Sequence, residues 1–106
     1  MKIGINGSGM VQKASVQAIT DHAAAAEAQG FAHYWLAEHP TGGLDALTTL
    51  ALVGQTVTSI ELGTAIVPTF PRHPLTLAGQ SLTVADVVGE RLTLGIGLSH
   101  APMLAQ

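Results

Sequence analysis

Residues 31–40 read Phe-Ala-His-Tyr-Trp-Leu-Ala-Glu-His-Pro, and they have the alternation typical of a half-buried β-strand. Alternation places Tyr34 and Leu36 on one face of the strand and Trp35 on the other. Gly30 precedes the run and Pro40 follows it, so the pattern predicts a strand over Phe31–Ala37. The strand brings the polar pair Glu38-His39 to its carboxyl end.

Three further runs of the same kind flank this stretch at a steady interval. The four predicted strands are Lys2–Asn6, Phe31–Ala37, Ile60–Val67 and Arg91–Gly97. Their first residues, at positions 2, 31, 60 and 91, are separated by 29, 29 and 31 residues. About 30 residues is the size of a strand-helix-strand unit, so a helix is expected in each interval.

The intervals contain helical patterns with recognisable ends. The first predicted helix begins near Val11 or Ser15 and ends at Gln29 before Gly30. The second begins after Gly43 and ends near Val57, and the third begins at Pro74 and is closed by Gly89. The expected buried stripes are Val16, Ile19, Ala23 and Ala26 in the first helix, Leu44, Leu47 and Ala51 in the second, and Leu75, Ala78, Leu82 and Ala85 in the third.

Alternating strands and helices predict a parallel sheet with right-handed crossovers. Two architectures satisfy this pattern: a small doubly wound sheet of four strands, or the first part of a (β/α)₈ barrel, which needs about 250 residues. In both, the chemistry lies at the carboxyl ends of the strands. Here those ends are residues 6–9, 38–41, 65–70 and 98–102.

The composition limits the possible functions. The 106 residues, taken as one domain over 1–106, carry a net charge of −3 and only 10% charged residues, which argues against nucleic acid or a membrane surface as a partner. There is no cysteine, no signal-peptide pattern and no apolar run of membrane-spanning length, so we expect a cytoplasmic protein. Low charge and open sheet edges predict a homo-oligomer.

A glycine-rich turn follows the first strand. Gly7 and Gly9 match the first two glycines of the dinucleotide-binding pattern G-x-G-x-x-G, but Gln12 occupies the third position. The acidic residue expected about 20 residues further on is also misplaced, because Glu38 lies 29 residues after Gly9. A small Rossmann-like dinucleotide-binding module therefore stays open only as an alternative, beside an ordinary Gly/Ser turn.

Three segments together resemble a known family. They are Trp35-x-x-Glu38-His39, then Leu62-Gly63-Thr64 with Arg72-His73-Pro74, then Gly89-Glu90-Arg91 with Leu94-Gly95-Ile96-Gly97. In this order and spacing they resemble the luciferase-like monooxygenases over nearly the whole chain, and most closely the branch that uses the deazaflavin coenzyme F-420. The resemblance implies an α/β fold, the N-terminal part of a TIM barrel comprising its first four strands.

The resemblance also implies a chemistry. Members move a hydride between a deazaflavin or flavin coenzyme and a small organic substrate, so the expected coenzyme is F-420, with FMN as the second choice. The phosphate-binding loops of such barrels commonly follow strands seven and eight, so the 106-residue chain alone is expected to be inactive. Residues that match Glu38 and His39 lie near the coenzyme ring in the family. His39 is expected to act as general acid/base or to orient the ring, since an imidazole exchanges protons near neutral pH.

The later strands carry the other expected site residues. In some members a non-proline cis peptide lies behind the coenzyme, and the matching bond joins Ala65 to Ile66. Some sugar-phosphate dehydrogenases of the family place a catalytic glutamate where this chain has His100, so a sugar-phosphate substrate is put in doubt. Ser99 is a candidate for a hydrogen bond to coenzyme or substrate. His100, like Glu38, is kept as a catalytic candidate.

Other conspicuous residues have structural interpretations. Trp35 is expected to pack in the core or line a barrel, His73 to cap a helix, and Arg72 to form an ion pair. The histidines show no metal-binding spacing, so no metal is expected. A further alternative is a non-catalytic half-barrel that self-associates through its sheet edges.

Overall fold

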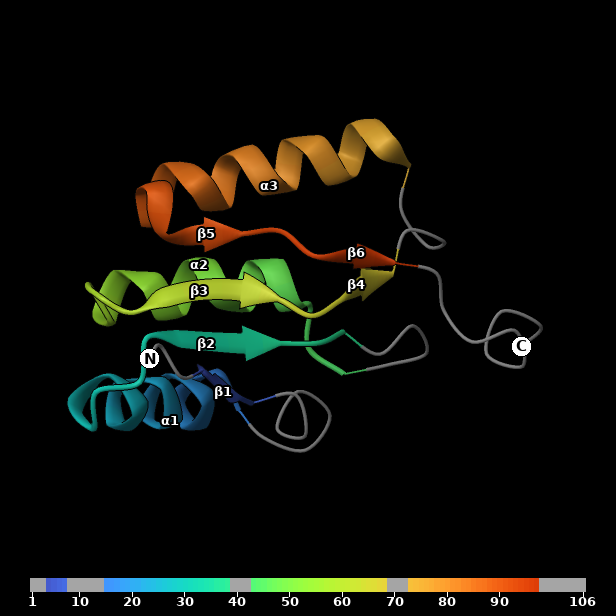
Figure 1. Ribbon diagram of the computed structural model, residues 1–106. Coiled ribbons are helices and arrows are strands. Elements are labelled where there is room, and N and C mark those ends of the chain that lie inside the picture. Colours follow the sequence, from blue (N-terminus) through green and yellow to red (C-terminus); the bar gives the residue numbers. More distant parts are fainter. Residues whose placement is uncertain (1–3, 8–14, 39–42, 69–72, 98–106) are drawn as a thin grey trace.

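The computed structural model describes residues 4–7, 15–38, 43–68 and 73–97 (Figure 1). Strands and helices alternate along the chain. The elements are β1 Gly4–Asn6, α1 Val16–Ala28, β2 His33–Leu36, α2 Ala46–Thr56, β3 Glu61–Thr64, β4 Val67–Pro68, α3 Pro74–Val88, a 3₁₀ turn Gly89–Arg91, β5 Leu92–Thr93 and β6 Ile96–Gly97.

All strand pairs of the described residues are parallel. The main sheet has the order β1-β2-β3-β5, and β4 pairs with β6 in a short continuation beyond it. One row of the register runs straight across the sheet, with Asn6 beside Trp35, Trp35 beside Gly63 and Gly63 beside Thr93. Sequential strands are therefore neighbours in space, as the strand spacing predicted.

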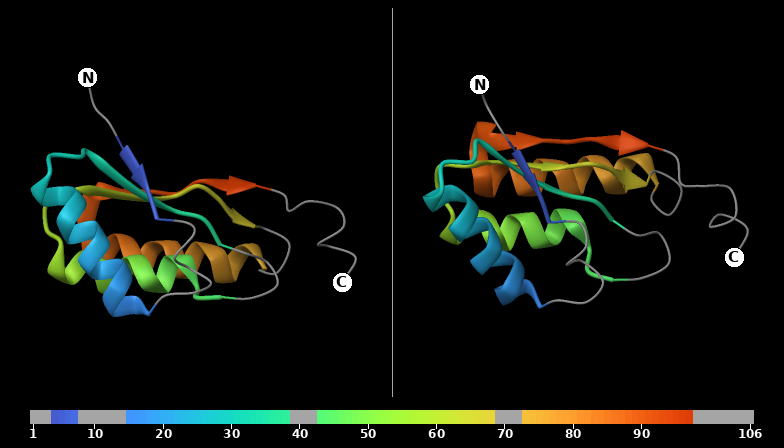
Figure 2. Two further views of the ribbon diagram at one scale, coloured as in Figure 1. Left: turned by 90° about the horizontal axis from the view of Figure 1, so that it is seen from below. Right: turned by 60° about the horizontal axis from the view of Figure 1, so that its bottom comes forward.

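All three helices cover the same face of this sheet (Figure 2). A doubly wound sheet would place helices on both faces, whereas a barrel keeps them all on its outside. The one-sided arrangement therefore confirms the barrel-type architecture, and the Rossmann-like alternative is wrong. The face opposite the helices corresponds to the interior of a barrel.

The core lies between this sheet and its helices. Alternation in β2 is as predicted, with Tyr34 and Leu36 buried and His33 and Trp35 half-buried on the other face. The helices pack against the face that carries Tyr34 and Leu36. They contribute Ile19, Ala23 and Ala26 from α1, and Leu47, Leu50 and Val53 from α2.

The helix ends follow local capping chemistry. Ser15, Asp45 and His73 are the N-caps of α1, α2 and α3, and each side chain accepts a hydrogen bond from a backbone amide of the first turn. The capping role expected for His73 is confirmed by its Nδ1, 3.1 Å from the amide nitrogen of Leu75. Gly30 has φ of 89° after α1, a conformation that favours glycine.

The third and fourth predicted strands are not continuous. The run Ile60–Val67 is divided into β3 and β4, and the run Arg91–Gly97 into β5 and β6. The breaks lie opposite each other, because Thr64 on one segment bonds to Gly95 on the other instead of continuing the regular ladder. The hydrophobic pattern could not predict these interruptions, because the residues on both sides of each break are apolar.

The buried stripe predicted for the third helix is wrong. Leu75 and Leu82 are 78% and 72% exposed, while Leu77, Val84 and Val88 face the core. The helix carries apolar residues on two stripes, and each has helical spacing. Packing against α2 and the sheet selects the second stripe and leaves the first on the surface.

Arg91 joins the end of α2 to the start of β3. Its guanidinium donates to the carbonyl oxygens of Val57 at 2.8 Å, Ile60 at 3.1 Å and Gly54 at 3.3 Å, while its Nε donates to Val88 at 3.0 Å. Carbonyls at a helix C-terminus have no partner within the helix, so a planar group with five donors suits this place.

Glu27 makes a second connection at the same end of the sheet. Its Oε2 accepts hydrogen bonds from the hydroxyl of Ser59 at 2.7 Å, the amide of Ser59 at 2.8 Å and the amide of Ile60 at 3.0 Å. These bonds, with the nearby positive charge of Arg91, lower the pKa of Glu27 below its ordinary value. The carboxylate thereby ties α1 to the loop before β3.

Replacing Arg91 by alanine is expected to lower the free energy of unfolding by about 2–3 kcal/mol, because carbonyls at the end of α2 lose a charged donor. Urea unfolding followed by circular dichroism measures the loss. Glu90→Ala, at the exposed neighbouring residue, is the matched control and should change stability by less than about 0.5 kcal/mol. Equal losses in both variants would contradict the role of Arg91.

Glu27→Gln is expected to destabilise the fold at neutral pH, and the difference from wild type should vanish in acid. A carboxyl whose folded pKa is lowered stabilises the protein above its unfolded pKa, near 4.5, and loses that effect as the pH falls through its folded pKa. Unfolding midpoints measured from pH 7 down to acid test this, with Asp86→Asn on the exposed side of α3 as control. A difference that stays constant with pH would refute it.

Candidate functional site

The carboxyl ends of the strands are organised by one side chain. The hydroxyl of Thr64 accepts a hydrogen bond from the amide of Gly95 and donates one to its carbonyl, both at 2.8 Å. The carbonyl of Gly95 also accepts from the amide of Val67 at 2.9 Å. A side chain at position 95 has no room, since its Cβ would lie 2.2 Å from the carbonyl oxygen of Thr64. We call this pair of residues the Thr64–Gly95 clasp.

The segment after the clasp carries two of the expected coenzyme-binding residues. The peptide bond between Ala65 and Ile66 is cis, in agreement with the expectation from the family resemblance. Ile66 is 37% exposed, and its side chain lies against Gly97, where an added Cβ would be 2.3 Å from its Cδ1. An aliphatic surface is thus presented at the carboxyl end of the sheet.

Glu38 is next to this segment. Its amide donates to the carbonyl oxygen of Ile66 at 3.0 Å, and the amide of Ala65 donates to Leu36 at 2.8 Å. The carboxylate of Glu38 accepts from the amide of Ala46, the first residue of α2, at 2.9 Å. A negative charge is favoured at a helix N-terminus, so α2 holds Glu38 at the end of β2.

The structure therefore brings together Glu38, Ala65 and Ile66 of the expected site residues. His39, Ser99 and His100 lie outside the described residues, as do Arg72, Gly9 and Gln12. Their roles stay predictions. A catalytic role for Glu38 also stays a prediction, beside the contact with α2 that its carboxylate makes.

Trp35 lies on the barrel-interior face, below the strand ends. Its indole passes over glycines of both neighbouring strands: an added Cβ would lie 2.4 Å from its Cζ3 at Gly63 and 2.9 Å from its Nε1 at Gly4. The ring of His33 stacks beside it with centroids 5.8 Å apart, and His33 pairs with the carboxylate of Glu61. Of the two roles expected for Trp35, lining the barrel is the one observed.

Gly7 has a packing explanation in place of a phosphate-binding one. An added Cβ there would lie 2.1 Å from the hydroxyl oxygen of Tyr34. That hydroxyl is hydrogen-bonded to Nδ1 of His22 at 2.8 Å, and burial raises the pKa of Tyr34 to about 12. The glycine at the end of β1 therefore makes room for a buried tyrosine.

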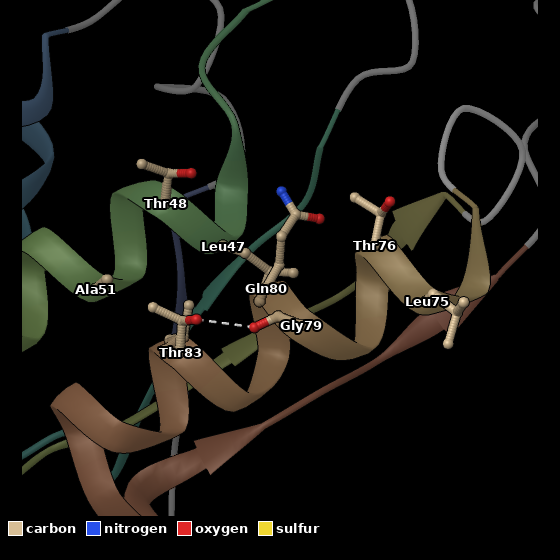
Figure 3. Close-up of a pocket in the computed structure, with 9 residues that line it drawn as sticks. Leu47, Thr48, Ala51, Leu75, Thr76, Gly79, Gln80 and Thr83 are labelled. Carbon is tan, nitrogen blue, oxygen red and sulfur yellow. Dashed lines mark hydrogen bonds between the residues drawn. The ribbon is translucent and has the colours of Figure 1, made fainter.

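A hollow of about 460 Å³ lies away from the strand ends, between α2 and α3 (Figure 3). Leu47, Thr48 and Ala51 line it from α2, and Leu75, Thr76, Gly79, Gln80, Thr83 and Val84 line it from α3. It is on the helix side of the sheet. Because catalytic groups of barrels gather at the carboxyl ends of strands, this hollow is not our candidate for the site.

Among the described residues, no three histidine, aspartate or glutamate side chains come together in a way that could hold a metal ion. No helix within the described ranges is long and apolar enough to cross a membrane.

The parallel sheet, with helices on one face and polar groups at the carboxyl ends of its strands, corresponds to part of a (β/α)₈ barrel. Comparison with known families assigns it further: the model of the luciferase-like monooxygenases matches residues 2–104. The chain belongs to this family, as its motifs indicated.

Several similar proteins have described functions. An F-420-dependent hydroxymycolic acid dehydrogenase of Mycobacterium tuberculosis is 36% identical over 84 residues, and a coenzyme F-420-dependent oxidoreductase of the same organism is 38% identical over 76. A 4-hydroxyprotoasukamycin monooxygenase of Streptomyces nodosus is 27% identical over 77 residues. These matches cover 69–72% of this chain and only 21–23% of the relatives.

Solved structures agree on the fold. An F-420-dependent tetrahydromethanopterin reductase from Methanopyrus kandleri superposes with a TM-score of 0.85 at 24% identity, over 98% of this chain and 29% of its own. The oxygenating component of 3,6-diketocamphane monooxygenase from Pseudomonas putida, solved with FMN, gives 0.84 at 18% identity, over 96% and 31%. Monooxygenase RslO1 from Streptomyces bottropensis gives 0.81 at 29% identity, over 96% and 34%.

Sequence reasoning missed the Thr64–Gly95 clasp and the pairing of His33 with Glu61. A signal for the first was present, since an isolated glycine within a strand pattern indicates a bulge or a close backbone approach. Nothing in the sequence marked the second, because residues 33 and 61 become neighbours only through the register of β2 and β3.

Gly95→Ala is expected to destabilise the fold by about 1–3 kcal/mol, because the new methyl group would overlap the backbone carbonyl oxygen of Thr64. Gly79→Ala is the matched control. Position 79 is inside α3 with nothing within 4 Å of an added Cβ, so alanine there should raise the free energy of unfolding by about 0.5–1 kcal/mol. Thermal unfolding of each variant measures its change in stability. A tolerated Gly95→Ala would contradict the clasp.

Proposed function

We propose that this chain forms the coenzyme side of a deazaflavin-dependent oxidoreductase that moves a hydride to or from a small organic substrate. The observation that carries the proposal is the meeting of Glu38 with the Ala65–Ile66 segment at the carboxyl ends of neighbouring strands. The chain spans about a fifth to a third of the relatives it matches, so activity and substrate are proposals about the whole protein.

The described residues suit a planar, largely apolar ring. Ala65 and Ile66 are exposed, and beside them Gly95 and Gly97 carry no side chain. The coenzyme, when bound, would supply the hydride carrier, and the protein supplies binding and orientation. Ala65 and Ile66 would support one face of the ring, and Ser99 would contribute a hydrogen bond.

Proton transfer falls to the chain's own side chains. A hydride that moves to or from a carbonyl or alcohol carbon requires a proton at the oxygen, and His39 has a suitable group to exchange it. Glu38, which precedes His39 in the chain, is held by the amide of Ala46 and would be a second polar group at the same strand end. His100 would stand at the end of the fourth strand as a second proton-exchanging group.

The choice of F-420 over FMN rests on the relatives. The two that are more than 30% identical are both described as F-420-dependent, while the FMN complex is 18% identical and supports the fold alone. FMN is the second choice.

The proposal predicts that the chain binds F-420 more tightly than FMN, and NAD not at all. Fluorescence titration of each coenzyme with the purified chain measures this. His39→Ala is expected to weaken F-420 binding about tenfold, the effect of losing about 1.4 kcal/mol. His73→Ala, which removes a helix cap, is the matched control and should leave coenzyme affinity unchanged.

Tighter binding of FMN would overturn the choice of coenzyme and keep the family chemistry. Equal losses from His39→Ala and His73→Ala would remove His39 from the site. Absence of binding to either coenzyme would contradict the proposal that these strand ends hold it.

A further inference from the structure

Glu38 joins three elements that are far apart in the sequence. Its amide donates a hydrogen bond to the carbonyl oxygen of Ile66 at 3.0 Å, and its Oε1 accepts one from the amide of Ala46 at 2.9 Å. In Figure 1 the carboxyl end of β2, the break between β3 and β4 and the start of α2 accordingly lie together. One residue therefore connects the candidate site to the layer of helices.

The backbone of Glu38 belongs to the candidate site. The amide of Ala65 donates to the carbonyl oxygen of Leu36 at 2.8 Å, and the amide of Glu38 donates back to Ile66. These two bonds continue the pairing of β2 with β3 past Thr64, where the regular ladder ends. A shift of Glu38 would therefore move the segment that forms the proposed coenzyme surface.

The side chain of Glu38 belongs to the start of α2. Ala46 is the first residue of that helix, and the amides of a first turn have no partner within the helix. The N-cap Asp45 accepts from the amide of Thr48 at 2.9 Å, while Glu38 accepts from that of Ala46. Ala46 is fully buried, so the loss of this acceptor would leave an unpaired donor away from water, which is costly.

We propose that Glu38 is a positioning residue, whose carboxylate holds the Ala65–Ile66 segment in place by binding the first amide of α2. The side chain fixes Glu38 to a buried helix start, and the backbone of Glu38 in turn fixes Ile66. The coenzyme surface is thus positioned from the helix layer as well as from the neighbouring strands. This inference rests on the proposed function, because the segment is the surface on which the coenzyme is proposed to lie.

The role needs an acceptor at a fixed reach and needs no proton. An amide N–H donates, so any oxygen in the place of Oε1 can accept its bond, and glutamine carries one at the same distance from the backbone. Aspartate keeps the charge, but its side chain is shorter by one methylene group. A glutamate that exchanged protons with a substrate would have the opposite requirement, since glutamine does not titrate.

Glu38→Asp and Glu38→Gln therefore separate reach from charge. Hydrogen exchange of single amides, followed by NMR without coenzyme, measures the contact directly. In Glu38→Asp the amide of Ala46 is expected to exchange about tenfold faster than in the wild type, as when one hydrogen bond is lost. The amide of residue 38, which donates to Ile66, should become faster with it. In Glu38→Gln both amides should stay within about threefold of the wild type, because only the helix-dipole contribution of the charge is lost.

Coenzyme affinity gives the second readout. Fluorescence titration of the purified protein with F-420 is expected to show about tenfold weaker binding in Glu38→Asp, because the segment beneath the coenzyme is no longer held. In Glu38→Gln the affinity should stay within about threefold of the wild type.

Asp45→Ala is the matched control, since it removes the other carboxylate at the same helix end. The amide of Thr48 should exchange faster in this variant. The amides of residues 38 and 65 and the affinity for F-420 should stay unchanged. Circular dichroism checks that all three variants keep their helices.

An affinity that is lost in Glu38→Gln and kept in Glu38→Asp overturns the proposal and gives Glu38 a role that needs its charge. Unchanged exchange at Ala46 in Glu38→Asp also overturns it, as does an equal loss at residue 38 in Asp45→Ala, which would indicate general loosening of α2. Absence of F-420 binding by the wild type would contradict the proposed function alone. Exchange at Ala46 and at residue 38 would still decide whether Glu38 positions the segment.

Discussion

The hydroxyl of Thr64 determines where the sheet changes from a regular ladder to the surface that serves as the candidate site. It bonds to both backbone groups of Gly95, so two strands break at the same level and resume as β4 and β6. Just beyond the break, Ile66 is exposed, and its carbonyl oxygen accepts a hydrogen bond from the amide of Glu38.

The two ends of the sheet have different tasks. At the amino ends, Arg91 and Glu27 satisfy the backbone groups of helix ends and loops, so that end provides stability. At the carboxyl ends, the polar Glu38 lies beside the exposed Ala65–Ile66 segment. This division is the one expected of a barrel, in which the stabilising and the reactive ends are opposite.

Much of the fold was predictable, because strand alternation in residues 31–37 and a repeat near 30 residues are local properties of the sequence. The stripe of α3 was not, since Leu75 and Leu82 form as regular a pattern as Leu77 and Val84, and only packing against α2 decides between them. Of the site, Glu38, Ala65 and Ile66 could be located through the family motifs. The Thr64–Gly95 clasp joins residues 31 positions apart, so the isolated glycine could indicate a close backbone approach but not the residue that makes it.

The indole of Trp35 covers the places where side chains of Gly4 and Gly63 would be. The three positions must therefore change together during evolution. A larger residue at Gly63 is acceptable only after Trp35 has been replaced by a smaller residue. Once position 63 carries a side chain, tryptophan no longer fits at position 35. The order of substitutions is thus fixed by one flat ring, and related chains should divide into those with the aromatic residue and two glycines and those with neither.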